Sequence, residues 1–121
     1  GIKFYQGSKL AKNMYKAGRG VVQGVERCHH IVARTSKRAK EAQDKLKKLG
    51  IDIDDAVNGV ALPTNFHNKM HTTEYYDAIN KLSKQWKTKD DAINSLNTIQ
   101  YHLRQKGIRN PNPAKGSVTY P

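Results

Sequence analysis

The sequence predicts a small α+β domain in which helices dominate around a minimal pair of strands. Two short stretches, at residues 21–32 and 57–62, hold clustered valine and isoleucine or other apolar residues that favour extended structure. Three longer stretches, at residues 39–49, 67–82 and 92–103, repeat apolar residues at helical spacing. At 121 residues the chain is long enough for one domain with a modest core.

The first half is expected to hold a short helix, a strand and a basic helix. An apolar side predicts a helix at residues 9–16, and glycines soon afterwards argue against a longer one. The strand of residues 21–32 follows. Thr35 or Ser36 can then cap a helix rich in lysine and arginine, which Gly50 ends.

The second half is expected to hold another strand and two helices. Residues 57–62 contain an Asn-Gly pair, a strong signal for a tight turn, and so predict a strand with a turn or a kink. The apolar spacing next predicts one helix over residues 64–86. Thr88 can cap the last helix, with Gly107 just past its end.

The charge of the chain is strongly positive and unevenly distributed. Lysine and arginine number 22 against 10 acidic residues, for a formal net charge of +12. Residues 1–50 hold 13 of the basic and 3 of the acidic residues, whereas residues 51–121 hold 9 and 7. An excess concentrated in one half is typical of a surface that binds a polyanion such as nucleic acid. A membrane surface is disfavoured because no stretch is apolar enough.

The boundaries and the surroundings of the domain are also expectations. A single cysteine, Cys28, cannot form a disulfide within the chain, which favours a reducing compartment. The chain begins without an initiator methionine or a signal peptide, which we interpret as a piece of a longer protein. We expect an N-terminal arm or linker at residues 1–25, the folded domain at residues 26–109, and a loose tail at residues 110–121.

Four of the five histidines form two pairs. His67 and His71 are four apart, so on one helix they stand on the same face, where two imidazoles can grip one divalent cation. His29 and His30 lie in the predicted strand, whose neighbouring side chains leave on opposite faces. We therefore expect one of them to complete the metal site and the other to face a substrate.

Such a site favours a catalytic ion over a structural one. Three imidazoles leave positions open for water and a phosphate oxygen, whereas a zinc finger closes four ligands that usually include thiolates. Cleavage of a phosphodiester needs an attacking water, which a neutral histidine can activate by taking its proton. It also needs stabilisation of the negative charge on the phosphate, which a divalent ion can provide. Imidazole ligands bind zinc or nickel more tightly than magnesium, but the ion that binds best need not be the one that supports turnover, so Zn, Ni, Mg and Mn all stay open.

These residues resemble the HNH nuclease motif of the ββα-metal, or His-Me finger, superfamily. Within it the chain resembles the AHH toxin nucleases, whose signature opens Ala-His-His and continues with an Asn-Gly-Val segment. The similarity covers about residues 29–82, and residues 58–63 are its most specific part after the histidines. Cys28 stands where the signature has alanine. The resemblance is carried by His29, His30, Asn58, His67 and His71.

The resemblance implies a role for each residue of the motif. His30 would be the general base that takes a proton from the attacking water, and Asn58 would brace the loop or serve as a further ligand. Glu26, on the same strand face as His30, is a candidate for orienting that ring. The metal ligands would be His29, His67 and His71.

Basic residues after the first histidine pair are expected to contact phosphate, although a solvated helix face is the ordinary fate of such a run. The tyrosines are expected mostly in the core, and only Tyr75 and Tyr76 are retained as candidate platforms for stacking on bases. His102 is expected to be structural or exposed. The expected phosphate contacts are Arg34, Lys37, Arg38, Lys40, Lys47 and Lys48.

Together these features predict a metal-dependent endonuclease that cleaves DNA. The resemblance implies the C-terminal toxin module of a secreted bacterial antibacterial effector, acting in the cytoplasm of the target cell. It also implies an acidic immunity protein as a partner, and we expect the domain to be a monomer. Two alternatives stay open: an RNase toxin on the same scaffold, and a non-catalytic nucleic-acid-binding module with a structural metal. Phosphate contacts carry no base information, so no sequence preference is predicted.

Overall fold

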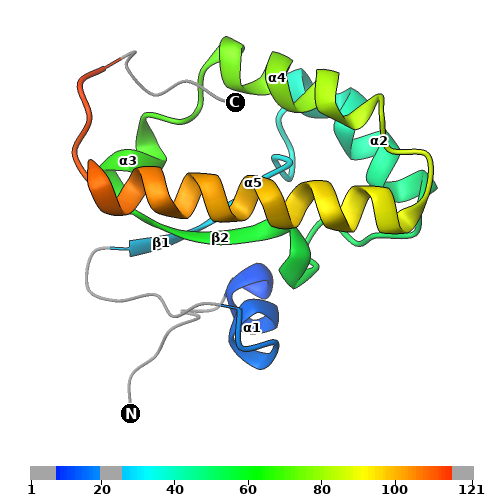
Figure 1. Ribbon diagram of the computed structural model, residues 1–121, viewed down its shortest axis with the longest axis horizontal. Helices are drawn as coiled ribbons and strands as arrows, with labels where there is room; N and C mark the ends of the chain where they lie inside the picture. Colours follow the sequence, from blue (N-terminus) through cyan, green and yellow to red (C-terminus); the bar gives the residue numbers. More distant parts are fainter. Residues whose placement is uncertain (1–7, 20–25, 116–121) are drawn as a thin grey trace.

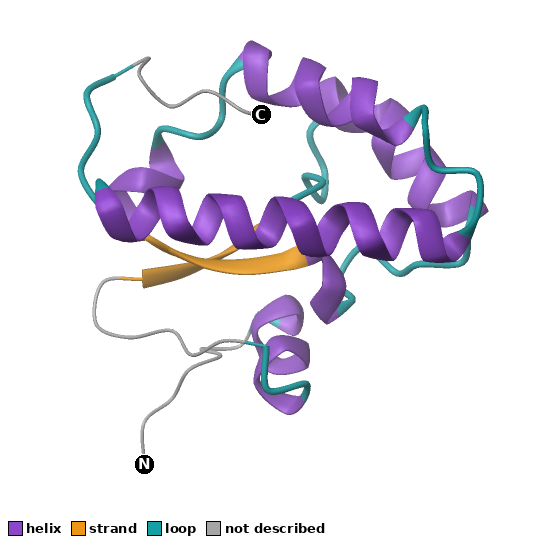
Figure 2. Ribbon diagram, viewed as in Figure 1, coloured by secondary structure: helices purple, strands orange, loops and turns teal. Residues whose placement is uncertain are grey.

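The computed structural model describes residues 8–19 and 26–115. Helices surround one pair of strands in this part of the chain, as Figure 2 shows, so the fold is the small, helix-rich α+β domain that the sequence predicts. In chain order the elements are α1 (Lys9–Lys16), β1 (Glu26–His30), η1 (Lys37–Ala39), α2 (Lys40–Lys48), η2 (Ala56–Asn58), β2 (Gly59–Pro63), α3 (Thr64–Asn68), α4 (Thr73–Ser83) and α5 (Lys89–Arg109). The labels η1 and η2 denote short 3₁₀ helices.

The strands β1 and β2 form an antiparallel ribbon that lies between two layers of helix. Its register pairs His30 with Gly59 and Cys28 with Ala61. The long helix α5 runs along the ribbon, α1 lies on the other side of it, and α2 and α4 pack together beyond α5 (Figure 1). Two antiparallel strands packed against a long helix are consistent with a ββα-metal core.

Burial of apolar side chains holds these layers together. The main core is shared by the ribbon, α5 and the pair α2 and α4, while Leu10 and Met14 of α1 form a second cluster with Ala61 of β2. The main core includes Leu46, Val60, Leu62, Phe66, Met70, Ile79, Trp86, Leu96 and Leu103. No helix in the described part of the chain is long and apolar enough to cross a membrane.

The prediction of a single helix over residues 64–86 is wrong. The chain leaves the helical path after α3 and starts again at α4, where the Thr72 hydroxyl accepts a hydrogen bond from the Tyr75 backbone N–H at 3.2 Å. Between the two helices Met70 is fully buried. We attribute the break to the insertion of this side chain into the core together with the strong cap at Thr72.

The prediction for the last helix is correct at its start, but the helix extends further at its end. Thr88 caps α5 in a capping box with Asp91, as expected. Gly107 lies inside α5 rather than beyond it. A Cβ there would come within 3.1 Å of Pro63 Cδ and 3.2 Å of Leu62 Cδ2, so this glycine lets α5 approach β2 closely.

The first strand and the Asn-Gly turn also differ from expectation. Residues 20–25, which include part of the predicted strand, lie outside the described residues, and Ile31 and Val32 are buried beyond the end of β1. Asn58 is the last residue of the 3₁₀ helix η2. Gly59 is the first residue of β2 and has an extended backbone, with φ −123°. The pair therefore forms no hairpin turn, because it precedes the strand.

The predicted basic helix is confirmed, together with its cap at Ser36 and its end at Gly50. Ser36 caps η1, which continues into α2, and Gly50 follows with a φ of +78°, a conformation that glycine adopts without strain.

Residues 8–19 contact the ribbon closely. Beyond the packing of α1, the Arg19 guanidinium donates to the carbonyls of Val57 and Gly59 at 3.0 and 3.2 Å and to Asn97 Oδ1 at 2.6 Å. The boundary expected at residue 25 lies outside the described residues, and only the first six residues of the expected tail, 110–115, are described.

Candidate metal centre

The strand β1 carries His29 into the interior of the domain. His29 is only 1% exposed, while His30, its neighbour on the opposite strand face, is half-buried. The Nε2 atom of His29 lies 3.0 Å from the Tyr75 hydroxyl, and its Nδ1 atom is buried without a hydrogen-bond partner among the described residues. A buried polar atom left unpaired costs free energy. This nitrogen is therefore free to bind a ligand.

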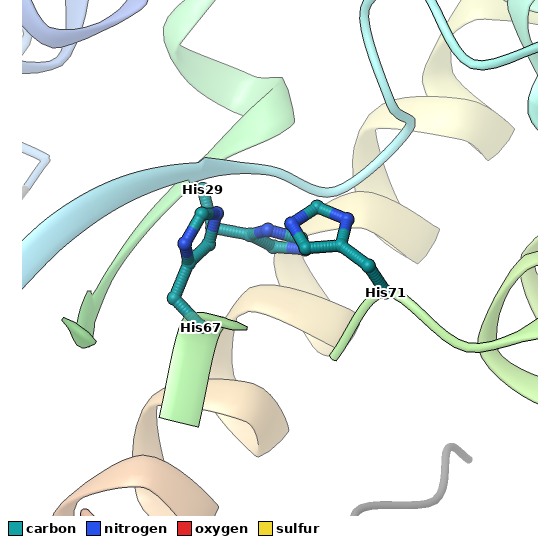
Figure 3. A group of neighbouring side chains, drawn as sticks. All are labelled: His29, His67 and His71. Carbon is teal, nitrogen blue, oxygen red and sulfur yellow. The ribbon is translucent and has the colours of Figure 1, made fainter. Parts of the chain in front are cut away.

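Two further histidines meet His29 from separate segments. His67 lies in the last turn of α3 and His71 in the link between α3 and α4. The prediction that the two histidines share one helix is therefore wrong. The ring centroids lie 5.0 Å apart for His29 and His67, 5.7 Å for His29 and His71, and 4.9 Å for His67 and His71. Figure 3 shows the three rings turned toward one another.

The chemistry of this cluster fits a divalent metal ion. The histidines offer one ligand atom each, and these atoms all lie within 4.8 Å of one another. His67 Nδ1 is a second buried nitrogen without a hydrogen-bond partner in the described residues. Neutral imidazole nitrogens suit zinc, nickel and other divalent transition metals. The orphaned nitrogens and the donor set therefore both support a three-histidine metal site.

The environment of the cluster keeps its imidazoles neutral. Burial, and secondly the neighbouring His67, His71 and His30, hold the pKa of His29 well below its usual value. Burial and then His71 lower the pKa of His67 to about 4. Burial and then the Arg38 guanidinium lower the pKa of His71. A metal ligand must be unprotonated, so these rings are in the ligating form at neutral pH.

His30 has a carboxylate partner of its own. Its Nε2 atom lies 2.8 Å from Asp54 Oδ1, and the side chain of Asp54 is only 5% exposed. Burial raises the pKa of Asp54, but the hydrogen bonds and charges of His30 and Arg34 outweigh it, so the net pKa lies below the ordinary value. Asp54 is thus an acceptor, which places a proton on Nε2 of His30 and leaves Nδ1 of the neutral ring with a free lone pair.

The carboxylate that contacts His30 is therefore that of Asp54, and not that of Glu26, which the sequence suggests. Glu26 lies four residues before His30 in an extended strand, roughly 13 Å along it, and forms an ion pair with Arg104. Asp54 reaches His30 instead. Sequence patterns did not single out Asp54, because the alternation of residues 51–54 groups it with the exposed Asp52.

Asn58 braces two segments that adjoin the site. Its Oδ1 accepts from the Val32 backbone N–H at 2.8 Å, and its Nδ2 donates to the carbonyls of Val32 and Ile53 at 3.0 and 2.9 Å. Asn58 is fully buried. With these contacts it fixes the backbone just after the histidine pair to the backbone just before Asp54, and its side chain has little capacity left to bind a metal.

A cavity of about 300 Å³ opens beside the histidines. Arg34 is the member of the predicted phosphate contacts that lines it, and Arg38 stacks on Tyr76, another lining residue, at 4.4 Å from the ring centroid. The remaining predicted contacts, all exposed, are Lys37, Lys40, Lys47 and Lys48, and they lie outside the lining. The full lining is Cys28, His29, His30, Ala33, Arg34, Thr35, Ser36, His67, His71 and Tyr76.

Cys28 has the environment of an unreactive thiol, and His102 is exposed, as the sequence predicts. Cys28 is half-buried, and burial raises the pKa of its thiol to about 11, which keeps it protonated and poorly nucleophilic. His102 is exposed on α5, distant in sequence from the cluster, and its ring contacts Tyr101.

Comparison with known protein families identifies the family of this chain. Residues 10–108 match a nuclease family of the HNH/ENDO VII superfamily with conserved AHH. The chain is a member of the AHH nuclease family. Comparisons with curated proteins and with solved structures gave no significant match. The Cys28-His29-His30 run, which resembles the Ala-His-His of this family, supplies the buried member of the histidine cluster and the partner of Asp54.

Membership of the AHH nucleases gives the domain a reaction class. Nucleases are hydrolases that act on phosphodiester bonds, and an enzyme of the HNH superfamily uses a metal in that reaction. The three-histidine cluster of this AHH nuclease is the group of described residues that can hold such an ion.

Proposed function

We propose that this AHH nuclease is a metal-dependent endonuclease that hydrolyses phosphodiester bonds of DNA. The observation that carries the proposal is the convergence of His29, His67 and His71 in a cavity that His30 also lines. A divalent ion bound there would stabilise negative charge on the phosphate and assist departure of the leaving oxygen. These histidines are the ligands in this proposal, and the metal is Zn, Ni, Mg or Mn.

His30 is the general base of this mechanism. The Asp54 carboxylate holds the proton on Nε2, so Nδ1 is the atom that accepts a proton from the attacking water. The ribbon keeps His30 apart from the cluster, because side chains of consecutive strand residues leave on opposite faces. The base is thereby kept free from the metal while it remains in the same cavity.

A positive surface adjoins the site and supports a nucleic acid as the substrate, for which we propose DNA. Arg34 lines the cavity and Arg38 stacks on its wall, and the net charge of +12 favours a polyanion. A combined replacement of Lys37 and Lys40 by alanine is expected to weaken DNA binding about equally for all sequences. It should also make the dependence of affinity on salt less steep, as binding measured between 50 and 200 mM salt would show. An unchanged salt dependence would remove these lysines from the interface.

Plasmid nicking tests the activity most directly. Cleavage should be abolished by EDTA and restored by added Zn²⁺, Ni²⁺, Mg²⁺ or Mn²⁺, each tested alone. Side-by-side digestion of plasmid and total RNA separates the DNase from an RNase on the same scaffold. Binding without cleavage in every metal, with a loss of melting temperature on chelation, would instead indicate a structural ion.

The biological setting is a proposal that extends the family resemblance. We propose that the domain is the C-terminal toxin module of a secreted bacterial effector, delivered into competing cells and active in their cytoplasm. The basic surface supports an acidic immunity protein as its partner in the producing cell. Expression of the domain inside a bacterial host should arrest growth and degrade DNA, and expression of His30→Ala should do neither. Growth arrest by both proteins equally would contradict a toxic role for cleavage.

A further inference from the structure

Two adjacent tyrosines on α4 each contact a different histidine of the cluster. The Tyr75 hydroxyl lies 3.0 Å from His29 Nε2, and the Tyr76 hydroxyl lies 2.9 Å from His71 Nδ1. Both tyrosines are nearly fully buried, at 2% and 4% exposure. Consecutive side chains of a helix point about 100° apart, so one helix turn can reach two separate ligands.

The direction of the hydrogen bonds at Tyr75 determines the state of His29. The Tyr75 hydroxyl donates its one hydrogen to the Ile31 carbonyl at 2.6 Å. It must therefore accept at His29, and Nε2 of His29 must carry the ring proton. The lone pair is then on Nδ1, which is the atom that is buried without a hydrogen-bond partner. Tyr75 thus leaves one nitrogen of His29 for a cation.

Tyr76 plays the same part for His71 from the opposite ring position. Its hydroxyl contacts Nδ1 of His71 at 2.9 Å. When Nδ1–H donates to this hydroxyl, the lone pair of the neutral ring is on Nε2, which is then the nitrogen that can bind a ligand. The Arg38 guanidinium stacks on the Tyr76 ring and donates to Thr73 Oγ1 at 3.3 Å. These contacts hold Tyr76 in place and connect a predicted phosphate contact to a predicted metal ligand.

We propose that Tyr75 and Tyr76 are positioning residues that select Nδ1 of His29 and Nε2 of His71 as the metal-binding atoms. The inference rests on the three-histidine metal site proposed above. Metal-bound histidines commonly donate a hydrogen bond from the N–H of their second ring nitrogen to a carboxylate or a carbonyl, which fixes the orientation of the ring. A phenol performs the same orientation without adding a negative charge beside the site.

Zinc affinity tests the role of each hydroxyl. Tyr75→Phe and Tyr76→Phe keep the aromatic ring and remove the hydroxyl, and competition with a chromophoric chelator measures the Kd for Zn²⁺. Each variant should bind Zn²⁺ on the order of 10-fold more weakly than the wild type. Tyr101→Phe, a control at an exposed position on α5, should bind as the wild type does. Wild-type affinity in both hydroxyl variants would overturn the proposal.

The ring proton can also be located without any variant. Long-range ¹H–¹⁵N correlation spectra of the metal-free wild type should show His29 with its proton on Nε2, and a proton on Nδ1 would overturn the proposal. In the Zn²⁺-loaded protein, metal should be bound through Nδ1 of His29 and Nε2 of His71. This measurement decides the matter even if loss of the bond to the Ile31 carbonyl unfolds Tyr75→Phe.

Failure of this inference can be told from failure of the metal site itself. A wild type that binds no Zn²⁺, or a His67→Ala variant that binds it as tightly as the wild type, would remove the three-histidine site and the inference with it. Tight binding by the wild type and by both phenylalanine variants, lost only in His67→Ala, would leave the metal site intact and reject the role of the tyrosines.

Discussion

His29 and His30 are neighbours with opposite environments, because an extended strand turns consecutive side chains to opposite faces. His29 is buried among the other imidazoles, whereas His30 contacts the Asp54 carboxylate across the loop. The sequence pattern predicts this division between a ligand and a residue that faces the substrate. It does not predict Asp54, whose contact with His30 joins residues 24 positions apart.

Alanine at His30 and at His67 should separate catalysis from metal binding. His30→Ala is expected to bind Zn²⁺ as the wild type does and to lose roughly 10²-fold or more in cleavage, the usual contribution of a general base. His67→Ala removes a proposed ligand and should lose both functions. Metal titration and plasmid nicking of the two proteins measure this, and equal metal binding in both would contradict the assignment.

Replacement of Asp54 by asparagine should slow cleavage without weakening the metal. An asparagine can donate to Nε2 of His30 and so favour the ring form that carries its proton on Nδ1, the wrong atom for a base. We expect kcat to fall on the order of 10²-fold, with the KM for DNA and the Kd for Zn²⁺ nearly unchanged. Asp77→Asn, at an exposed position on α4, is the matched control. An unchanged kcat would show that Asp54 does not position the base.

Among the elements, the break between α3 and α4 decides how His67 and His71 reach the site. A continuous helix would place His67 and His71 one turn apart on the same face. The break instead lets Met70 enter the core and brings His71 in from the short link that ends at Thr72. Apolar periodicity continues through both segments, which is why the sequence predicts one helix, and burial of Met70 is a tertiary effect that periodicity does not contain.

Thr72→Ala should destabilise the domain by removing the cap of α4. The expected loss is about 1 kcal/mol in the free energy of unfolding, the usual value for such a cap, measured by urea denaturation. Thr98→Ala provides the control, because Thr98 is exposed within α5 and alanine favours a helix interior. An effect of Thr72→Ala no greater than that of Thr98→Ala would show that the cap does not determine where α4 begins.

At the scale of the whole molecule, local signals were predictable and long-range contacts were not. The caps at Ser36 and Thr88 depend on a few neighbouring residues, and both were found where the sequence places them. The contact of His29 with Tyr75 joins residues 46 apart, and the approach of Gly107 to β2 depends on the packing of α5. Spacing within one element carries no information about such contacts.

The metal-free protein should lose stability as the pH falls below about 6.5. His29, His67 and His71 all have lowered pKa values in the folded state, that of His67 to about 4. Between about pH 6.5, the unfolded value, and about pH 4, the unfolded chain therefore binds more protons, and protonation favours unfolding. Thermal denaturation in EDTA from pH 7.5 to 5 should show a melting temperature that falls by several degrees.

Two variants identify the groups responsible for this pH dependence. His67→Ala should flatten the decrease, because one of the histidines that resist protonation is gone. His102→Ala should leave it unchanged, because His102 is exposed on α5. A melting temperature that does not change over this range in the wild type would contradict the lowered pKa values of these histidines in the folded state.

The Arg19 guanidinium connects three parts of the chain that are far apart in sequence. It binds the carbonyls on either side of Asn58, at Val57 and Gly59, and it also binds Asn97 on α5. Proteolytic removal of everything before β1 would leave those carbonyls without this donor and uncover the apolar cluster beneath α1. The shortest fragment that melts as one cooperative unit should therefore begin before residue 9, upstream of the histidine motif that defines the family.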